Sequence, residues 1–324
     1  MTAFLVSTAR LRMPAASLFT RPVNDIRSGF RASSATSRFY FQKTNNSTTS
    51  CHSGNRLSGR TCMVTGGTSG IGFAIAERFL QEGATSVILV GRSQERLQAA
   101  AGRLDVSNDH GNSITGTSNK VRLLVGDVGD IGSWKHELEK EMANVDILVN
   151  AAGISINNIL PRSELDDISQ VLRTNLEGAM LTSRALVRAT IRNRVRNRNF
   201  APDTKTPSKC IINISSLLAL KAGTGAVPYA ASKAGLLGLT RSLAVEVSAS
   251  LKDVVIRSNA IVPGYIDTPM ITDFTPGEVD RLKAMIPLHR FGKPSEIADA
   301  AFFLATNEYA NNCILNLDGG LGAV

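Results

Sequence analysis

Glycines at four positions between residues 66 and 72 join an apolar run to a helical pattern. Residues 62–64 have the composition of a short buried strand, and residues 73–80 repeat apolar side chains at helical spacing. Glycine lets a backbone approach a pyrophosphate, and the start of a helix offers free N–H groups and the positive end of its dipole. This order predicts a dinucleotide-binding βα unit. Because the spacing Gly66-x3-Gly70-x-Gly72 matches neither G-x-G-x-x-G nor a P-loop, a tight turn without a ligand stays open as the alternative.

Strand and helix patterns continue to alternate along the rest of the chain. Strands are expected at 86–91, 121–125, 145–149, 210–215, 254–261 and 313–317, and helices at 131–143, 164–192, 228–250 and 294–305. The helix over 164–192 is expected to turn its apolar side chains inward, namely Leu165, Ile168, Leu172, Leu176 and Met180. Repeated βα units predict the α/β class, as a single Rossmann-type, doubly wound parallel sheet with helices on both faces.

The end of the second predicted strand carries a cation where dinucleotide-binding folds place a ribose contact. An acidic side chain there would accept hydrogen bonds from the 2′-hydroxyl of the adenosine ribose. The sequence is Gly91-Arg92-Ser93, and an arginine would instead pair with a 2′-phosphate. Arg92 therefore favours NADP(H) over NAD(H), with a solvated surface arginine as the alternative.

Tyr229 and Lys233 stand four residues apart, and Tyr229 comes thirteen residues after Ser216. Residues at i and i+4 share one face of a helix, so the ammonium would lie beside the phenol. A free tyrosine has a pKa of about 10, and the ammonium is expected to lower that pKa into a range useful for proton transfer. Ser216, at the end of an apolar strand, could hold a substrate carbonyl against the phenol. Taken alone, the pair could equally be an ordinary helix face.

Further motifs occur with these in one order, namely Thr65–Gly72, Asn150-Ala-Ala-Gly153, Asn175, Ser216 and Tyr229-x3-Lys233. With them the chain resembles the short-chain dehydrogenase/reductase family over residues 57–324. The resemblance implies that Ser216 polarises a carbonyl, that Tyr229 acts as the acid, and that Lys233 binds the nicotinamide ribose and tunes the phenol. Asn175 would help to hold a water chain that resupplies the proton, although it could simply break a helix.

The resemblance also implies a set of residues that bind NADP(H). Asp127 corresponds to a residue that contacts adenine, and Asn150 to one that supports the central strand and lines the site. The full set is Thr65, Gly66, Thr68, Ser69, Gly70, Ile71, Gly72, Arg92, Asp127, Val128, Asn150, Ala151, Gly153, Tyr229, Lys233, Pro263, Gly264 and Thr268. The last three correspond to the segment beside the carboxamide and phosphates. A strand exit at Asn150 and Gly153, and a plain turn at Thr268, are the alternatives.

Two positions depart from the family pattern. Many NADP-preferring relatives carry Arg or Lys just before the second motif glycine, where this chain has Ser69, so the 2′-phosphate argument rests on Arg92. Relatives often read Tyr-Ile-Thr-Gly where this chain has Tyr309-Ala-Asn-Asn312, a difference that concerns the last strand and a subunit contact.

Within the family, the resemblance is to 3-oxoacyl-[acyl-carrier-protein] reductases and related NADPH carbonyl reductases. It is carried by residues 148–154, 229–236, 286–292 and 317–321. It implies an NADPH-dependent reductase of 3-oxoacyl thioesters bound to an acyl carrier protein, assembled as a homotetramer. The alternatives are a broad carbonyl, quinone or hydroxyacyl reductase with the same catalytic set, and a non-catalytic dinucleotide-binding scaffold or redox sensor.

The net charge of +9 is concentrated at the start of the chain. Residues 1–60 contain nine Lys or Arg and one acid, so the remainder is nearly neutral and gives little support for a nucleic-acid partner. A segment rich in Arg and Ser and poor in acids is typical of an organelle transit peptide. We expect a disordered mitochondrial presequence at 1–40, a linker at 41–56 and the catalytic domain at 57–324, with import into the matrix. A basic tail without an address is the alternative.

Other features limit the possible functions further. No apolar run approaches the roughly 18 residues that a membrane span needs. The four histidines form no ligand spacing, so no metal site is expected. Cys62, Cys210 and Cys313 fall in predicted strands and are expected to be buried free thiols.

A basic run, Arg192-Asn-Arg-Val-Arg-Asn-Arg198, follows the long predicted helix. Its four arginines, Arg192, Arg194, Arg196 and Arg198, could dock an acidic acyl carrier protein and raise the encounter rate. Cations that complement the dipole at the end of a helix are the alternative interpretation.

Overall fold

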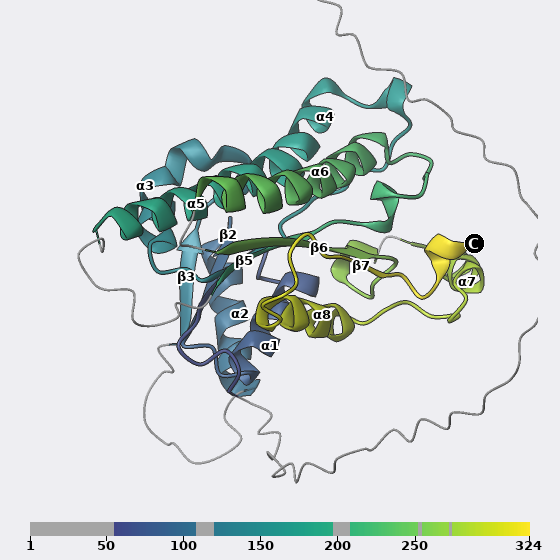
Figure 1. Ribbon diagram of the computed structural model, residues 1–324. Coiled ribbons are helices and arrows are strands. Elements are labelled where there is room, and N and C mark those ends of the chain that lie inside the picture. Colours follow the sequence, from purple (N-terminus) through teal and green to yellow (C-terminus); the bar gives the residue numbers. More distant parts are fainter. Residues whose placement is uncertain (1–54, 108–119, 197–207, 252–254, 272–273) are drawn as a thin grey trace, which may run out of the picture. The chain divides into compact units, whose positions relative to one another are not determined.

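The computed structural model describes residues 55–107, 120–196, 208–251, 255–271 and 274–324. The predicted presequence at 1–40 and Arg198 therefore lie outside the described residues. Within those residues, a sheet of seven parallel strands has the order β3-β2-β1-β4-β5-β6-β7 (Figure 1). The strands are β1 (Thr61–Thr65), β2 (Ser86–Gly91), β3 (Val121–Val125), β4 (Ile147–Asn150), β5 (Lys209–Ile214), β6 (Ile256–Pro263) and β7 (Ile314–Leu317). This order confirms the predicted doubly wound α/β class.

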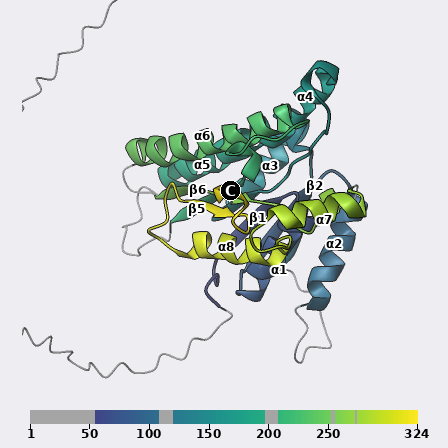
Figure 2. The same ribbon diagram turned by 90° about the vertical axis from the view of Figure 1, so that its right-hand side faces the viewer.

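Helices cover both faces of the sheet, as Figures 1 and 2 show. One face carries α1 (Gly70–Gln81), α2 (Gln94–Ser107) and α8 (Pro294–Thr306), and the other carries α3 (Lys135–Met142), α5 (Gly178–Arg196) and α6 (Val227–Ser250). The central strands are buried on both sides, as is usual for parallel strands. β4 is mostly apolar, whereas β6 is buried although it contains Arg257, Ser258 and Asn259.

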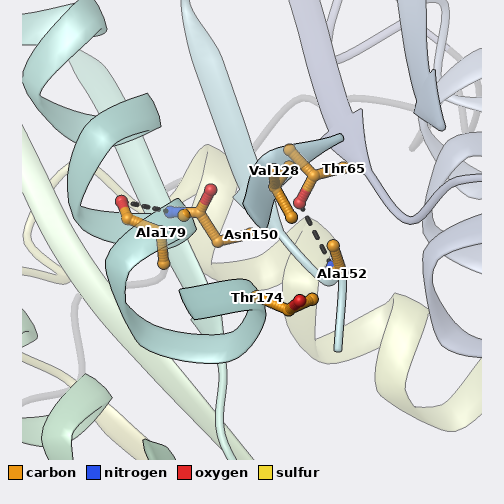
Figure 3. Close-up of a pocket in the computed structure, with 7 residues that line it drawn as sticks. Thr65, Val128, Asn150, Ala152, Thr174 and Ala179 are labelled. Carbon is orange, nitrogen blue, oxygen red and sulfur yellow. Dashed lines mark hydrogen bonds between the residues drawn. The ribbon is translucent and has the colours of Figure 1, made fainter. Parts of the chain in front are cut away.

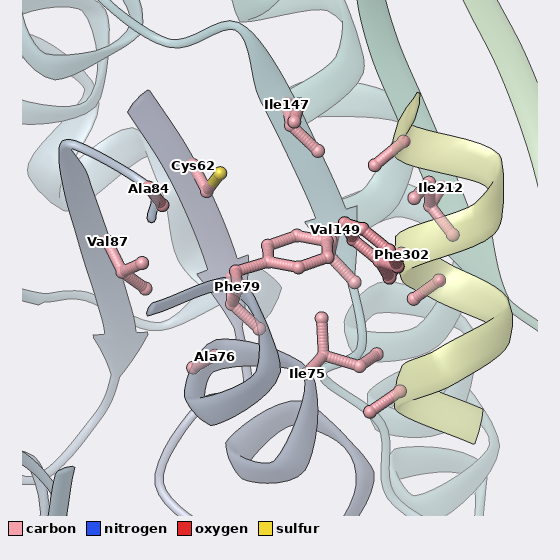
Figure 4. Close-up of a cluster of buried hydrophobic side chains, with 14 of the residues drawn as sticks. Cys62, Ile75, Ala76, Phe79, Ala84, Val87, Ile147, Val149, Ile212 and Phe302 are labelled. Atoms are coloured by element: carbon pink, nitrogen blue, oxygen red, sulfur yellow. The ribbon is translucent and has the colours of Figure 1, made fainter. Parts of the chain in front are cut away.

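The core under α1 and α8 shows how these helices are held on the sheet. Phe79 of α1 and Phe302 of α8 pack against strand residues that include Cys62, Val149 and Ile212 (Figure 4). Phe79 is fully buried, and burial of a large apolar side chain contributes roughly 1.5–3 kcal/mol. This packing holds α1 and α8 on the sheet.

The helix predicted over 164–192 is interrupted. The chain forms α4 (Leu165–Leu172), a π-helical turn over Arg173–Glu177, and then α5. A π turn holds an extra residue, so apolar positions that share one face in a continuous helix point in different directions on either side of it. The inward orientation predicted for three side chains is wrong, because Leu165 is 81% exposed, Leu172 37% and Met180 44%, and the buried residue of α4 is Val171 instead.

One helix, α7 (Pro276–Met285), was not expected from the apolar pattern. It begins with Pro276 after a capping box, in which Thr275 accepts a hydrogen bond from the Glu278 backbone and the Glu278 carboxylate accepts one from the Thr275 backbone. Its only fully buried side chain is Leu282 among the residues that the structure describes in it. The capping box and the proline at the first helical position therefore predict this helix better than the spacing of its apolar residues does.

Three cysteines are free, with Cys62 and Cys210 buried and Cys313 partly buried, which confirms that they form no disulfide among the described residues. Burial raises the pKa of the thiols of Cys62 and Cys210, so both stay protonated at neutral pH. None of the described helices is long and apolar enough to cross a membrane.

Candidate active site

The carboxyl ends of the central strands bring the sequence motifs to one edge of the sheet. Thr65 at the end of β1 is paired with Asn150 at the end of β4, which is paired in turn with Asn213 near the end of β5. Open parallel sheets bind their ligands at this edge, between neighbouring strands whose connections run to opposite faces. Here β1 leads to α1 on one face and β4 leads to α5 on the other.

Two glycines of the turn lie where other backbone packs too closely for any side chain. Gly66 has φ of +67°, and a Cβ there would lie 2.8 Å from Ala152 Cα. A Cβ on Gly72 would lie 2.4 Å from the Gly66 carbonyl oxygen. Ser69 caps α1 through its backbone only, so no side chain occupies the N–H groups of the first turn. These features fit the pyrophosphate of a dinucleotide.

Two buried polar side chains fix the loop after β4 (Figure 3). The Thr65 hydroxyl accepts hydrogen bonds from the backbone N–H groups of Ala151 (3.1 Å) and Ala152 (3.2 Å). The side-chain amide of Asn150 donates a hydrogen bond to Asn213 Oδ1 (2.9 Å), and its oxygen accepts one from the Thr182 hydroxyl (2.8 Å). Both side chains are buried, and their polar atoms are bonded within the protein, so they hold this edge of the sheet in place.

A small hollow lies between these loops. It is lined by Thr65, Val128, Asn150, Ala152, Thr174, Gly178 and Ala179 (Figure 3). Asp127 begins the 3-10 turn Val128–Trp134, where its carboxylate accepts a hydrogen bond from the Gly129 N–H (2.9 Å). The structure thus brings Asp127 and Val128 to the same edge as the glycine turn, and their binding of a cofactor stays a prediction.

Asn175 lies in the π turn between α4 and α5, and it is buried. Its side chain accepts from the Ile154 N–H (2.8 Å) and donates to the Ile154 carbonyl (2.9 Å) and to the Ser232 hydroxyl (3.0 Å). These bonds join the loop after β4 to α6. Asn175 therefore does interrupt the helix, and the same interruption turns its amide toward Lys233.

Lys233 and Asn175 flank Gly153. A Cβ built on Gly153 would lie 3.3 Å from Lys233 Nζ and 3.4 Å from Asn175 Oδ1. The ammonium donates to the Ile214 carbonyl oxygen (2.8 Å), and burial lowers the pKa of Lys233 from 10.5 to about 8. The ammonium is thus still the main form at pH 7.

Ser216 and Tyr229 meet across the turn that follows β5. The Ser216 hydroxyl hydrogen-bonds to the Tyr229 side chain and also accepts from the Leu218 N–H (3.2 Å). Burial raises the pKa of the half-buried Tyr229 phenol, and the bond to Ser216 opposes this shift. The predicted lowering by Lys233 is wrong for the protein alone, since its Nζ lies 5.6 Å from the ring centroid and desolvation outweighs its field. The phenol therefore keeps its proton at neutral pH, as an acid must.

The remaining predicted residues lie around this centre. Thr268 contacts Gly70 at the start of α1, with 3.3 Å from Thr268 Cγ2 to the position of a Gly70 Cβ. Gly264 follows Pro263 at the end of β6, where a Cβ would lie 2.8 Å from Asp318 Cα. Arg92 is exposed directly after β2. The same edge carries Thr68, Ser69 and Ile71 in the glycine turn and the start of α1.

Comparisons with known proteins show the family of this chain. Residues 66–322 match the family described as "Enoyl-(Acyl carrier protein) reductase", and a solved structure named as a short chain dehydrogenase/reductase family protein shares 32% identity. That structure covers 83% of this chain and 100% of its own, with a TM-score of 0.68. The chain belongs to the short-chain dehydrogenase/reductase family.

Several relatives of this short-chain dehydrogenase/reductase have names that specify an activity. The 3-oxoacyl-[acyl-carrier-protein] reductase of Bos taurus is 37% identical over 81% of this chain and 98% of its own length. The enzyme of that name from Thermotoga maritima is 34% identical over 82% and 99%. A Beutenbergia cavernae structure with bound NADP, described as a candidate NAD(P)-dependent gluconate 5-dehydrogenase, is 31% identical, covers 83% and 98%, and has a TM-score of 0.70.

Sequence reasoning missed two polar residues of this dehydrogenase/reductase site. Ser232 is fully buried and receives the Asn175 amide, while its own hydroxyl donates to the Tyr229 carbonyl oxygen (2.7 Å). Ser215 donates to the Lys233 carbonyl oxygen (2.8 Å). Because Ser232 directly precedes Lys233 and Ser215 directly precedes Ser216, their positions in the sequence could have indicated that they lie at the site. The described residues contain no group of three or more His, Cys, Asp or Glu that could hold a metal ion.

Proposed function

We propose that this protein is an NADPH-dependent reductase of 3-oxoacyl thioesters, of the 3-oxoacyl-[acyl-carrier-protein] reductase type. The observation that carries the proposal is the meeting of a protonated Tyr229 and Ser216, beside buried Lys233, at the edge that holds the glycine turn. The names of the relatives, which cover nearly their whole length, support the substrate class.

The glycine turn fits the phosphates of NADP(H), because Gly66 and Gly72 allow the tight turn before α1 and the Ser69 side chain makes no capping hydrogen bond to that helix. When bound, the nicotinamide supplies a hydride to the carbonyl carbon of the substrate. Ser216 donates a hydrogen bond to the carbonyl oxygen, and Tyr229 transfers its proton to that oxygen as negative charge develops. The Lys233 ammonium then favours the phenolate that remains.

Reprotonation of Tyr229 needs a path from solvent. Lys233 and Asn175 lie on either side of Gly153, and Asn175 holds the Ile154 backbone through two hydrogen bonds. In our proposal Asn175 keeps this loop open to water beside the ammonium, so that a proton can return through Lys233 to the phenolate.

The direct test follows the absorbance of NADPH in the presence of a 3-oxoacyl thioester. Tyr229→Phe should lower kcat at least about a hundredfold, with little change in the Kd for NADPH. Tyr309→Phe is the matched control, because it removes a hydroxyl from a tyrosine that is 98% exposed. Near-normal kcat in Tyr229→Phe would contradict the mechanism.

The same assay separates the alternatives. Turnover of quinones or simple ketones at a higher kcat/KM than 3-oxoacyl thioesters would identify a broad carbonyl reductase with this catalytic set. Binding of NADPH without turnover of any carbonyl would identify a non-catalytic scaffold or redox sensor.

An acyl carrier protein could bind the arginines at the end of α5, which lie far from the catalytic serine of the same chain. α5 begins beside Asn150, at the carboxyl end of β4, and ends where Asn193 donates to the Ala143 carbonyl oxygen (2.7 Å), before β4 begins. Arg192 pairs with Glu139 (3.6 Å). A carrier protein docked at Arg194 and Arg196 would therefore serve the site of a second copy.

Replacement of Arg192, Arg194, Arg196 and Arg198 by Gln should raise KM for carrier-bound substrates. It should leave KM for a small thioester analogue unchanged. Equal effects on both substrates would contradict docking at this end of α5.

We further propose that the protein acts in the mitochondrial matrix, in fatty-acid synthesis. The support is the basic, acid-poor sequence of residues 1–40. Residues 1–45 fused to a fluorescent reporter should direct it to mitochondria, whereas a diffuse cytosolic signal would contradict the proposal.

A further inference from the structure

The catalytic serine begins a short turn that behaves as one hydrogen-bonded unit. The Ala219 N–H donates to the Ser216 carbonyl oxygen (2.9 Å), and the Leu218 N–H donates to the Ser216 hydroxyl (3.2 Å). The Lys221 N–H donates to the Leu217 carbonyl oxygen (2.8 Å). Because these bonds overlap, a displacement of Lys221 is passed to Ser216.

The side chain of Lys221 reaches a segment that is 100 residues away in the sequence. Its ammonium donates to the carbonyl oxygen of Leu321 (2.8 Å) and to the backbone oxygen of Val324. Hydrogen bonds from a charged donor are stronger than those between neutral groups. Lys221 therefore holds the turn after Ser216 against residues 318–324.

Residues 318–324, which Lys221 contacts, are held in place by their own hydrogen bonds. Asp318 accepts hydrogen bonds from the Gly320 N–H (2.9 Å) and the Gly322 N–H (2.9 Å), which closes the segment on itself. The carbonyl oxygens of the 3-10 turn Leu321–Ala323 are thereby kept in place for the ammonium.

Apolar packing joins the same two segments at the end nearer to the catalytic serine. Leu217, directly after Ser216, forms a buried cluster with Leu321 and Ile286. A Cβ on Gly322 would lie 3.2 Å from Leu217 Cδ1, so the two turns are in close contact. The turn after Ser216 is thus fixed at both ends, by Leu217 and by Lys221.

We infer that Lys221 is a positioning residue for carbonyl reduction, which acts by bonding residues 321–324 and so fixing the Ser216 hydroxyl opposite the Tyr229 phenol. The inference rests on the proposed function only in that Ser216 holds the carbonyl oxygen. A misplacement of about 1 Å in such a group can lower a rate by about a hundredfold. Loss of the Lys221 bonds therefore affects turnover more than cofactor binding, since the glycine turn lies elsewhere along the edge and the contact of Gly264 with Asp318 does not involve Lys221.

The test compares Lys221→Met with Lys221→Arg. The methionine variant should lower kcat at least about tenfold, leave the Kd for NADPH unchanged and speed hydrogen exchange at the amides of 218–221. The arginine variant keeps a cation of similar reach and should restore kcat. Leu321→Ala removes the apolar contact of the same junction and should lower kcat in the same way.

Lys209→Met is the matched control. Lys209 also bonds a backbone carbonyl, that of Val145, and the Asp146 carboxylate (3.2 Å), but at the opposite end of β5. It should lower the melting temperature and leave kcat unchanged. A Lys221→Met enzyme with unchanged kcat, or an equal loss of kcat in Lys209→Met, would overturn the inference.

Two further results would need a separate interpretation. If the parent enzyme reduces another carbonyl but no 3-oxoacyl thioester, the proposed substrate is wrong, and the kcat for that carbonyl gives the same comparison. If Lys221→Met does not fold, Leu321→Ala decides, since unchanged kcat in that variant would contradict the role of this junction.

Discussion

Lys233 owes its low pKa to burial rather than to a neighbouring cation. Its side chain is enclosed by α6, β5 and the loop at Gly153, and the cost of desolvating the ammonium lowers its pKa from 10.5 to about 8. In the unfolded chain the lysine keeps its ordinary pKa. Between pH 8 and 10.5 the unfolded chain therefore binds more protons at this group, and the free energy of unfolding rises with pH.

We predict that Lys233→Met removes this pH dependence. The free energy of unfolding of the parent, relative to that of the variant, should rise by about 1.4 kcal/mol for each pH unit above pH 8. Urea unfolding of both proteins at several pH values from 7 to 10 measures it. The buried cysteines and Tyr229 titrate in both proteins, so they cancel in the comparison. Parallel stability curves would contradict the low pKa.

Our proposal that the cofactor is NADP(H) depends on Arg92. It is exposed at the end of β2, so it can reach a 2′-phosphate without a desolvation cost. Arg92→Asp should lower the preference for NADPH over NADH at least about tenfold, measured as the ratio of kcat/KM values. Lys140→Asp on α3 makes a similar charge change on the other face of the sheet and should leave the ratio unchanged. An unaltered ratio in Arg92→Asp would assign phosphate recognition to another group.

Asn312 illustrates how a departure from the family pattern is accommodated. It occupies the position where relatives often have glycine, and its φ is +56°, in the left-handed region. Asparagine tolerates this conformation better than other non-glycine residues. The neighbouring Asn311 accepts the Ser258 N–H (3.0 Å), so the chain enters β7 in register despite the substitution.

At the level of elements, the end of α8 depends on an arginine from β6. Arg257 is 1% exposed and donates to the carbonyl oxygens of Leu304 (2.6 Å), Ala305 (2.9 Å) and Ala310 (3.0 Å) and to the Ser208 hydroxyl (2.7 Å). The last carbonyls of a helix have no partner within the helix, and a cation there also complements the dipole. Arg257 thus joins α8 to the sheet at the end remote from the active site.

Arg257→Met should lower the free energy of unfolding by about 3–5 kcal/mol, because several buried acceptors lose their partner. Urea unfolding measures the loss, and hydrogen exchange should quicken in the last turn of α8. Arg122→Met on β3 is the control, since Arg122 is 46% exposed and pairs with Glu141. Its loss should cost about 1 kcal/mol or less. Equal costs in the two variants would argue against the role of Arg257.

At the scale of the whole molecule, helices α5 and α6, on one face of the sheet, carry exposed apolar side chains. Met180, Ile191 and Val195 on α5 are 44%, 40% and 65% exposed, and Val245 on α6 is 69% exposed. Water-exposed apolar side chains grouped on one surface are typical of contacts between proteins. They agree with the homotetramer expected from the family resemblance, which stays a prediction.

We predict that light scattering after gel filtration finds a mass near four times the chain mass of 34.6 kDa. Val195→Glu and Met180→Glu together should shift the protein toward smaller species, because a contact would bury unpaired charges. Val255→Glu introduces the same charge at a residue that is 60% exposed before β6 and should leave the mass unchanged. A parent protein that is monomeric at micromolar concentration would contradict the prediction.

The doubly wound parallel sheet and the glycine turn follow from the sequence, because each depends on local spacing. The roles of Ser216, Tyr229 and Lys233 rest on spacing together with the family resemblance and stay a prediction. The π turn at Asn175 does not, since it depends on bonds that Asn175 makes to Ile154 and to Ser232 of α6. The exposure of Leu165 and Met180 was not predictable either, because it depends on which face of each helix packs on the rest of the fold, and in α4 the buried residue is Val171.

The direction of the pKa shift of Tyr229 could not be predicted from the sequence either. Spacing places an ammonium near the phenol, but only the packed structure gives the distance and the burial that set the balance between Coulombic attraction and desolvation. The contact of Lys221 with residues 321–324 is of the same kind, because it joins segments about a hundred residues apart. Such contacts depend on how the whole chain closes on itself, and no local pattern records them.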